Sequence, residues 1–305
     1  MRGYSPLKGL FVTTLSSTLS SSFLKTYSWK SLQVNSYSYF KHSTFRAWKQ
    51  RTFSKMSELD KSVLDAAKKL AAYQAVDDHI EDGMVIGIGS GSTVVYAVER
   101  IAERTLSESM KLTCIPTSLQ AKDLIIKHKL PLSDLDVNYH IDVTIDGCDE
   151  CDSNLNLIKG GGGCLLQEKI VAAASKKLII VADYTKDSTF LGENWQKGIP
   201  LEISQIGWKV VLEKLNRVSK PEGGHSILRQ AVKKMGPIVT DNSNFLIDFQ
   251  VGNIFKDKKS PREIETWLKT IPGILETGLF VDMANQAYFG QPDGTVRKTE
   301  EIDRK

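Results

Sequence analysis

Apolar and polar residues alternate along this chain with helical and strand periods in turn. From Leu59 to Ile80, apolar positions recur every three or four residues, which predicts an amphipathic helix. Short apolar runs and helical patterns then alternate. The predicted strands are Met84–Ile88, Lys111–Ile115, Ile141–Asp146 and Lys177–Asp183, and the predicted helices are Thr93–Arg104, Leu119–His128 and Cys164–Ser175. This alternation is typical of a parallel β-sheet covered by helices.

The pattern changes after Gly198-Ile199-Pro200. The predicted elements are now a helix at Gln205–Arg217, strands at Ser226–Val232, Pro237–Thr240 and Phe245–Val251, and a helix at Ser260–Thr270. Strands that follow one another without intervening helices favour a compact α+β unit. After Gly273, the apolar residues Ile274, Leu275 and Gly278–Val281 predict a strand that returns to the first sheet.

Composition changes this picture mainly at the N-terminus. The chain has 305 residues, of which 41% are apolar and 25% charged, as in ordinary soluble proteins. Residues 1–56 hold nine Lys and Arg, twelve Ser and no acidic residue, so the rest of the chain is mildly acidic. This stretch is too interrupted to span a membrane and predicts a disordered basic leader or a transit peptide. Its dispersed charges make a nucleic-acid-binding arm the weaker interpretation.

The leader also bears on localisation. A form that starts near Met56 would be cytoplasmic, whereas the leader would direct the full chain to mitochondria or another organelle.

The densest chemistry lies between Asp146 and Glu168. Asp146 ends a predicted strand, and ligands of open α/β sheets bind at the carboxyl ends of strands. Lys159 is followed by four glycines, whose bare N–H groups predict an anion or oxyanion cradle. In the helix that follows, we expect Leu166, Ile170 and Ala173 to be buried, which leaves Glu168 on the opposite side, free to face a cleft.

Each of these residues also has a structural interpretation. Asp146 suits an Asx turn, Asp149, Glu150 and Asp152 suit a solvated acidic loop, and Glu168 suits the first turn of a helix. Their crowding favours an active site. No metal is predicted, because no His lies near the acidic loop and Lys159 would repel a cation.

A second motif precedes the helix at Thr93–Arg104. Here a short strand leads into Ser90-Gly91-Ser92-Thr93, which places N–H groups, hydroxyls and a helix N-terminus around one point. The glycine spacing is not that of a dinucleotide-binding loop, and no Gly-Lys-Ser/Thr follows as in a P-loop. A phosphate monoester therefore suits this loop better than NAD or ATP, unless the glycines only make a turn.

The four cysteines are Cys114, Cys148, Cys151 and Cys164. Cys148-x-x-Cys151 has the spacing of a redox motif or half a zinc site, but no second pair follows it. Free thiols in a reducing compartment are the simpler interpretation.

From about Leu64 to Asp293 the chain resembles the type A ribose-5-phosphate isomerases. The resemblance lies in the Gly-Ser-Gly-Ser-Thr loop and in Asp-Gly-x-Asp-Glu, Ile-Lys-Gly-Gly-Gly and Gln-Glu-Lys-Ile, in that order. It implies interconversion of D-ribose 5-phosphate and D-ribulose 5-phosphate, in the non-oxidative pentose phosphate pathway, without metal or organic cofactor. It also implies a homo-oligomer, either a dimer or a dimer of dimers, with no nucleic-acid or membrane partner.

The fold implied by the resemblance is α/β. A Rossmann-like, mostly parallel sheet domain, residues 57–198 plus 278–305, would carry an inserted smaller α+β (ferredoxin-like) domain, residues 199–277.

Residue roles follow from the same resemblance. Glu168 matches the catalytic base of the family. The chemistry of such an isomerisation then predicts that Asp146 moves hydroxyl protons and that Lys159 stabilises the enediolate. The substrate-binding residues would be Ser90, Gly91, Ser92, Thr93, Asp146, Gly147, Cys148, Asp149, Lys159, Gly160, Gly161, Gly162, Lys186 and Lys68. The family usually has alanine where this chain has Cys148.

Three other functions remain open at this point. Related domains serve as sugar-phosphate sensors of regulators, although no helix-turn-helix segment is evident here. An aminosugar-phosphate deaminase would use a similar phosphate loop, and a redox or zinc protein would depend on Cys148 and Cys151.

Overall fold

The structure is a computed structural model that describes residues 60–251 and 259–304. All of these residues belong to one compact unit. The leader at 1–56 and the predicted helix start at Leu59 lie outside the described residues. Within the described part, no helix is long and apolar enough to cross a membrane.

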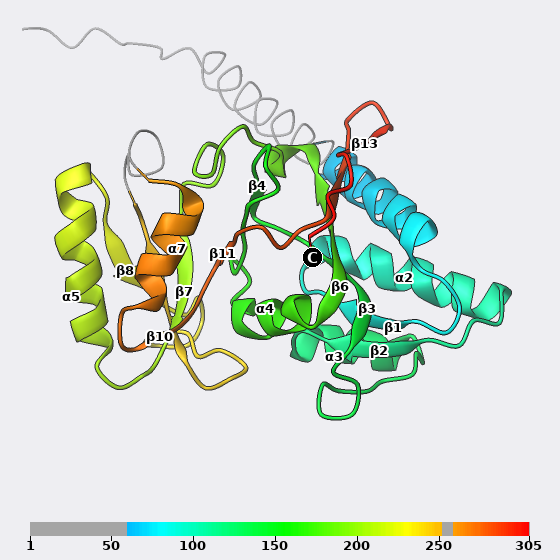
Figure 1. Cartoon of the computed structure of the whole chain (residues 1–305), viewed down its shortest axis with the longest axis horizontal. Helices are drawn as coiled ribbons and strands as arrows, with labels where there is room; N and C mark the ends of the chain where they lie inside the picture. The colour runs from blue at the N-terminus through cyan, green and yellow to red at the C-terminus, as the bar shows by residue number, and fades with distance from the viewer. Residues whose placement is uncertain (1–59, 252–258, 305) are drawn as a thin grey trace, which may run out of the picture. The chain divides into compact units, whose positions relative to one another are not determined.

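A six-stranded sheet carries the four strands predicted before Gly198 (Figure 1). Its order is β13 (Val296–Lys298), β12 (Gln286–Gly290), β6 (Ser175–Asp183), β3 (Ile141–Asp146), β1 (Val85–Ile88) and β2 (Thr113–Pro116). All neighbouring strands are parallel except the β12 and β13 pair. The prediction of a mostly parallel, helix-covered sheet is therefore confirmed.

Helices cover both faces of this sheet because its central strands are apolar on both sides. Residues 60–79 are helical and, with α2 (Ser92–Ser107) and α3 (Leu119–Lys127), bury one set of alternating strand residues, such as Ile86, Ile145 and Ile179. The opposite set meets α4 (Leu165–Ala173) and a small sheet. The small sheet is β11 (Leu279–Phe280), β5 (Leu157–Ile158) and β4 (Glu150–Cys151).

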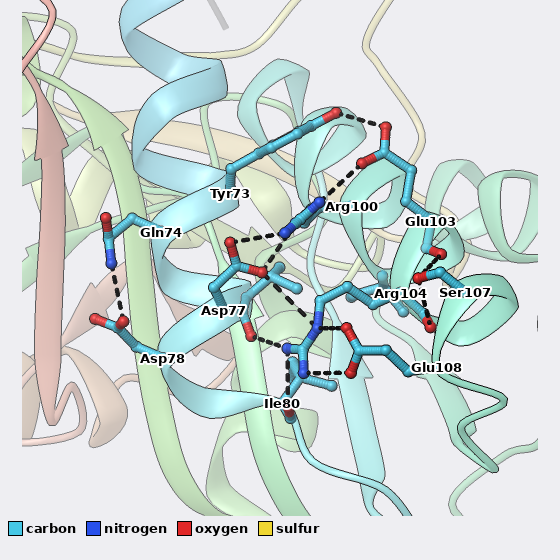
Figure 2. A network of polar contacts seen from close by, with 12 residues as sticks. Tyr73, Gln74, Asp77, Asp78, Ile80, Arg100, Glu103, Arg104, Ser107 and Glu108 are labelled. Atoms are coloured by element: carbon cyan, nitrogen blue, oxygen red, sulfur yellow. Dashed lines mark hydrogen bonds and ion pairs between the residues drawn. The ribbon is translucent and has the colours of Figure 1, made fainter.

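A polar network fixes the helix of residues 60–79 against α2 (Figure 2). The guanidinium of Arg100 donates to both carboxylate oxygens of Asp77, at 2.9 and 3.1 Å. Arg104 donates to the carbonyl oxygens of Val76 and Ile80, each at 3.0 Å, and so satisfies carbonyls at the helix C-terminus. Both helices line the candidate site, so this network sets their spacing.

A second sheet follows β6 in the chain and is entirely antiparallel. Its order is β10 (Ile274–Thr277), β7 (Ile199–Ile203), β9 (Phe245–Phe249) and β8 (Ser226–Leu228). The helices α5 (Trp208–Ser219) and α7 (Pro261–Lys269) bury Leu215 and Leu268 in its core. Ser260 caps α7 through a capping box with Glu263. Helix α4 contacts strands of both sheets, as Figure 1 shows.

Two strand predictions were wrong. Gly278–Val281 does not return to the first sheet, because Leu279 and Phe280 pair with β5 and it is β12 that lies beside β6. Pro237–Thr240 forms no strand; Pro237 makes one isolated bridge to Gln230. Both stretches have apolar residues that fit a strand, but short apolar runs do not specify a pairing partner.

Candidate active site

A pocket of about 360 Å³ opens where β1, β3 and β6 end. It is lined by Leu64, Lys68, Ser90, Gly91, Ser92, Thr93, Gln120, Gly147, Cys148, Asp149, Lys159, Gly160, Gly161, Gly162, Cys164, Glu168, Asp183, Thr185 and Lys186. All the predicted substrate-binding residues line it except Asp146, which lies fully buried behind it. The carboxyl end of a parallel sheet thus holds the pocket, as expected for this architecture.

Asp146 is held in one orientation by the backbone around it. Its Oδ1 atom accepts hydrogen bonds from the N–H groups of Ser90, at 3.0 Å, and Gly147, at 2.7 Å. Gly89 makes this possible, since a Cβ added there would lie 2.1 Å from Asp146 Oδ1 and 2.6 Å from its Cα atom. One carboxylate oxygen is therefore fixed to the phosphate-loop side, and the other points toward Lys159.

Lys159 joins the two buried carboxylates. Its Nζ atom lies 3.0 Å from Asp146 Oδ2 and 3.3 Å from Glu168 Oε2, and it donates to the Gly147 carbonyl oxygen at 2.5 Å. Burial disfavours the charge on Lys159, but Asp146 and Glu168 outweigh burial, so its pKa lies above its usual range. Lys159 follows β5 directly, and its N–H donates to the Gly278 carbonyl at 2.8 Å.

Glu168 lies on α4 and is only 5% exposed. Burial, reinforced by the charge of Asp146 and opposed by Lys159, raises its pKa to about 8. Its Oε2 atom and Asp146 Oδ2 accept no well-formed hydrogen bond from the described residues, so Lys159 is their ion-pair partner. A carboxyl group with such a pKa can both take and return a proton near neutral pH.

The predicted buried face of α4 was wrong. Ile170 is 48% exposed, and Leu165, Glu168, Val171 and Ala172 are buried instead. Glu168 is paired with Lys159, and its neighbour Lys169 lies between Glu265 and Glu276, at 2.7 and 3.0 Å. These ion pairs allow charged residues to occupy the inner face, which hydrophobic periodicity cannot indicate.

The glycine loop after Lys159 lies on the other wall of the pocket. Gly160 has φ +99°, and the Gly163 N–H donates to the Gly160 carbonyl at 3.0 Å, which closes a tight turn. The Gly161 N–H donates to Asp149 Oδ2 at 2.6 Å. Burial raises the pKa of Asp149, and this N–H opposes the shift. Asp149 and the glycine turn are thus fixed to each other.

The opposite end of the pocket is built for an anion. Gly91 precedes α2 with φ 110° and has no side chain to cap the helix, and its N–H donates to Gln120 Oε1 at 2.8 Å. Ser90 Oγ lies 2.9 Å from Thr117 Oγ1 and donates to Ser118 Oγ at 2.6 Å. Lys68 and Lys186 are half-buried and line the same pocket from other elements. A helix N-terminus in a pocket that lysines line favours a phosphate group.

The cysteines form no bridge among the described residues. Cys114, Cys148, Cys151 and Cys164 are free, and Cys151 is 1% exposed in the core. Burial raises the pKa of the Cys148 and Cys164 thiols, the latter to about 11. Thiols held in this protonated form are weak nucleophiles. In the described part of the chain, no three His, Cys, Asp or Glu residues gather closely enough to hold a metal ion.

Sequence reasoning assigned no role at the substrate to several residues that line the pocket. Gln120 is in the first turn of α3, and Cys164 is the residue before α4. Asp183 ends β6 and accepts from the Thr185 N–H at 3.0 Å. Gln120 could have been predicted, because it closely follows β2, and β2 ends at the same edge of the sheet as its parallel neighbour β1.

The family model of ribose 5-phosphate isomerase A (phosphoriboisomerase A) matches residues 113–294. The chain belongs to the ribose 5-phosphate isomerase A family. Human ribose-5-phosphate isomerase is 50% identical over 239 residues, which cover 78% of this chain and 75% of the human protein. The Dictyostelium discoideum ribose-5-phosphate isomerase is 54% identical over 237 residues, or 77% of this chain and 97% of that protein.

Solved structures of ribose 5-phosphate isomerases have the same fold as this chain. A D-ribose-5-phosphate isomerase in complex with phospho-erythronic acid is 38% identical, with a TM-score of 0.71, and the match covers 78% of this chain and 99% of that one. Ribose 5-phosphate isomerase from Plasmodium falciparum is 36% identical, with a TM-score of 0.70 and coverage of 78% and 99%.

Proposed function

We propose that this protein is an aldose-ketose isomerase that interconverts D-ribose 5-phosphate and D-ribulose 5-phosphate through an enediolate. One observation carries the proposal. A buried carboxyl group with a raised pKa, Glu168, lies 3.3 Å from a buried ammonium, Lys159, in a pocket whose other end is a helix N-terminus. Membership of the ribose 5-phosphate isomerase A family supports the same reaction.

The phosphate of the substrate binds at the start of α2. There the N–H groups and hydroxyls of Ser92 and Thr93 and the ammonium group of Lys68 can face it. Lys186, whose charge acts on Asp149, lines the sugar instead. In this structure the Gly91 N–H donates to Gln120 Oε1 at 2.8 Å. When the phosphate binds, this N–H donates to a phosphate oxygen instead. This remote grip supplies binding energy that orients the carbonyl end of the sugar.

Glu168 takes the proton from C2 of the aldose and returns it to C1. A single base can serve both carbons, because they are adjacent and the enediolate between them is planar. A pKa of about 8 balances the fraction of ionised base against its proton affinity near neutral pH. The charge that develops on the sugar oxygens then needs donors nearby.

Lys159 and the glycine turn are those donors. The Lys159 ammonium is buried and fixed by three oxygen partners, so it needs no reorganisation when charge develops beside it. Loss of one such donor typically costs about a hundred- to a thousandfold in rate. Asp146, held rigidly by two N–H groups, moves the hydroxyl proton, and Asp149 orients the sugar hydroxyls.

We also propose that residues 199–277 form an inserted α+β domain in a Rossmann-like domain of residues 57–198 plus 278–305. The antiparallel sheet β10-β7-β9-β8 lies between β6 and β12 in the chain and has an apolar core made mostly of residues 199–277, which supports this division. A homo-oligomer remains a proposal, and sedimentation equilibrium of the purified chain tests it.

The test of the activity is turnover by the full chain treated with a chelator. We expect ribose 5-phosphate to yield ribulose 5-phosphate, ribose to react far more slowly because the phosphate grip is lost, and phospho-erythronic acid to inhibit, since its planar carboxylate resembles an enediolate. An Asp146→Asn variant should lose activity, and Asp136→Asn, in an exposed loop, is the control. A folded protein that binds the sugar phosphate without converting it would overturn the proposal in favour of a sensor.

A further inference from the structure

The glycine turn of the active site is held by a residue of the second sheet. Arg229 directly follows β8, and its backbone is fixed on both sides, since its N–H donates to the Leu246 carbonyl at 2.8 Å and its carbonyl accepts from Ile238 at 3.0 Å. Its Nη1 atom reaches the carbonyl oxygens of Gly160 and Gly161, at 2.9 and 3.2 Å. One guanidinium group therefore binds two successive peptides of the turn.

Asp248 fixes the guanidinium itself. Its Oδ2 atom accepts from Arg229 Nε at 2.9 Å, and its Oδ1 atom accepts from Nη2, so the pair is bidentate. The two side chains are only 16% and 12% exposed, and Asp248 lies within β9. A bidentate pair of this kind fixes direction as well as charge. Arg229 and Asp248 together thus form a rigid unit on the antiparallel sheet, which we call the arginine arm.

The arginine arm determines which way the peptides of the turn face. In a trans peptide the C=O and N–H groups point in opposite directions. Because Arg229 binds the Gly161 carbonyl, the N–H of Gly162 points away from Arg229. The preceding peptide is held at both ends, by Arg229 at the Gly160 carbonyl and by Asp149 at the Gly161 N–H. Glycines have no side chain to prevent a flip of these peptides, so an external hold is needed.

We infer that Arg229, fixed by Asp248, is a positioning residue that keeps the peptides of the glycine turn oriented for the developing enediolate. The inference rests on the proposed isomerase activity. Arg229 is absent from the residues that line the pocket, so it acts through the turn and does not touch the substrate. Removal of Arg229 should therefore slow the reaction at the sugar carbons more than it weakens binding of the phosphate group.

The test is an Arg229→Lys variant of the full chain. Lysine keeps the charge but cannot bind two carbonyls and a carboxylate in one plane. We expect kcat to fall at least about tenfold, because displacement of a donor by about 1 Å can cost a hundredfold. KM for ribose 5-phosphate and inhibition by inorganic phosphate should change less than about threefold, while inhibition by phospho-erythronic acid weakens.

Arg262→Lys is the matched control. Arg262 also forms a pair with an aspartate, Asp282, but the pair is exposed on the surface, at 62% and 45%. This variant should keep the parent's kcat and KM. If the parent itself fails to convert ribose 5-phosphate, the proposed function fails; if the parent is active, the comparison tests Arg229 alone.

Two further measurements separate positioning from folding. Guanidinium ion added to an Arg229→Ala variant should restore part of kcat without raising the thermal unfolding temperature of that variant. Asp248→Asn combined with Arg229→Lys should cost no more than the worse single variant, since both break the arginine arm. A kcat within twofold of the parent, a loss confined to KM, or additive losses would overturn the inference.

Discussion

Replacement of Glu168 by glutamine should cost activity and increase stability. The glutamine side chain matches the protonated carboxyl in shape and carries no charge into the pocket. In the native protein, burial raises the pKa of Glu168 from 4.5 to about 8. The folded state therefore holds a proton that the unfolded state has already lost between these two pH values.

The sign follows from this difference. Where the folded state binds more protons than the unfolded state, the free energy of unfolding falls as pH rises. The loss begins near pH 4.5 and is complete just above pH 8. At about 1.4 kcal/mol per unit, the full shift corresponds to about 5 kcal/mol. Because water enters and Lys159 adjusts when Glu168 ionises, we expect roughly half of this, about 2–3 kcal/mol.

The assay is urea unfolding at about pH 5 and pH 9, followed by the fluorescence of the chain's five tryptophans. The free energy of unfolding of Glu168→Gln, relative to that of the parent, should increase by about 2–3 kcal/mol between the two pH values. Comparison of parent and variant at each pH cancels the other titrating groups. Glu213→Gln, an exposed change on α5, should show no such growth. A gain that stays constant from pH 5 to pH 9 would refute the raised pKa of Glu168.

Three further predictions concern the neighbours of Glu168. Lys159→Met should lower kcat about a hundred- to a thousandfold. It should also shift the rising limb of the pH profile of kcat/KM to higher pH, because it removes the charge that lowers the pKa of Glu168. A rising limb at the same pH as in the parent would contradict this. Gly89→Ala should lower the free energy of unfolding by about 2–3 kcal/mol, since the new Cβ would meet Asp146, whereas Gly162→Ala, with no atom within 4 Å of its Cβ, should cost far less in urea unfolding. Replacement of Cys148 and Cys151 by alanine should leave an active isomerase, and loss of turnover in a folded variant would favour the redox or zinc interpretation.

Local sequence predicted the site residues well where a strand is followed directly in the chain by a turn. The phosphate loop after β1 and Asp146 at the end of β3 were predicted because a strand end fixes both position and direction within a few residues. Lys159 and Glu168 were also found by their crowding in the chain. Their mutual distance of 3.3 Å, however, follows from the packing of β5 against β11 and of α4 against both sheets.

Other parts depended on contacts that local sequence does not encode. Arg229 binds carbonyl oxygens 68 and 69 residues away, and no side-chain motif records such a bond. The prediction of the inner face of α4 was wrong because Glu168 and Lys169, each in an ion pair, occupy positions where hydrophobic periodicity predicts apolar residues. Strand β12 was missed because its Gln286 and Gly290 break the apolar pattern, although all its residues are buried.

The most direct test of the account is proton transfer at the sugar carbons, followed by NMR in D2O. The parent enzyme should place solvent deuterium on C1 of ribulose 5-phosphate as it forms, because the C2 proton taken up by Glu168 exchanges with D2O on the carboxyl group before the same group delivers a proton to C1. Glu168→Gln should be slower by about a hundred- to ten-thousandfold, and Glu213→Gln should match the parent. Exchange by Glu168→Gln at the parent's rate would contradict the assignment of Glu168 as the base.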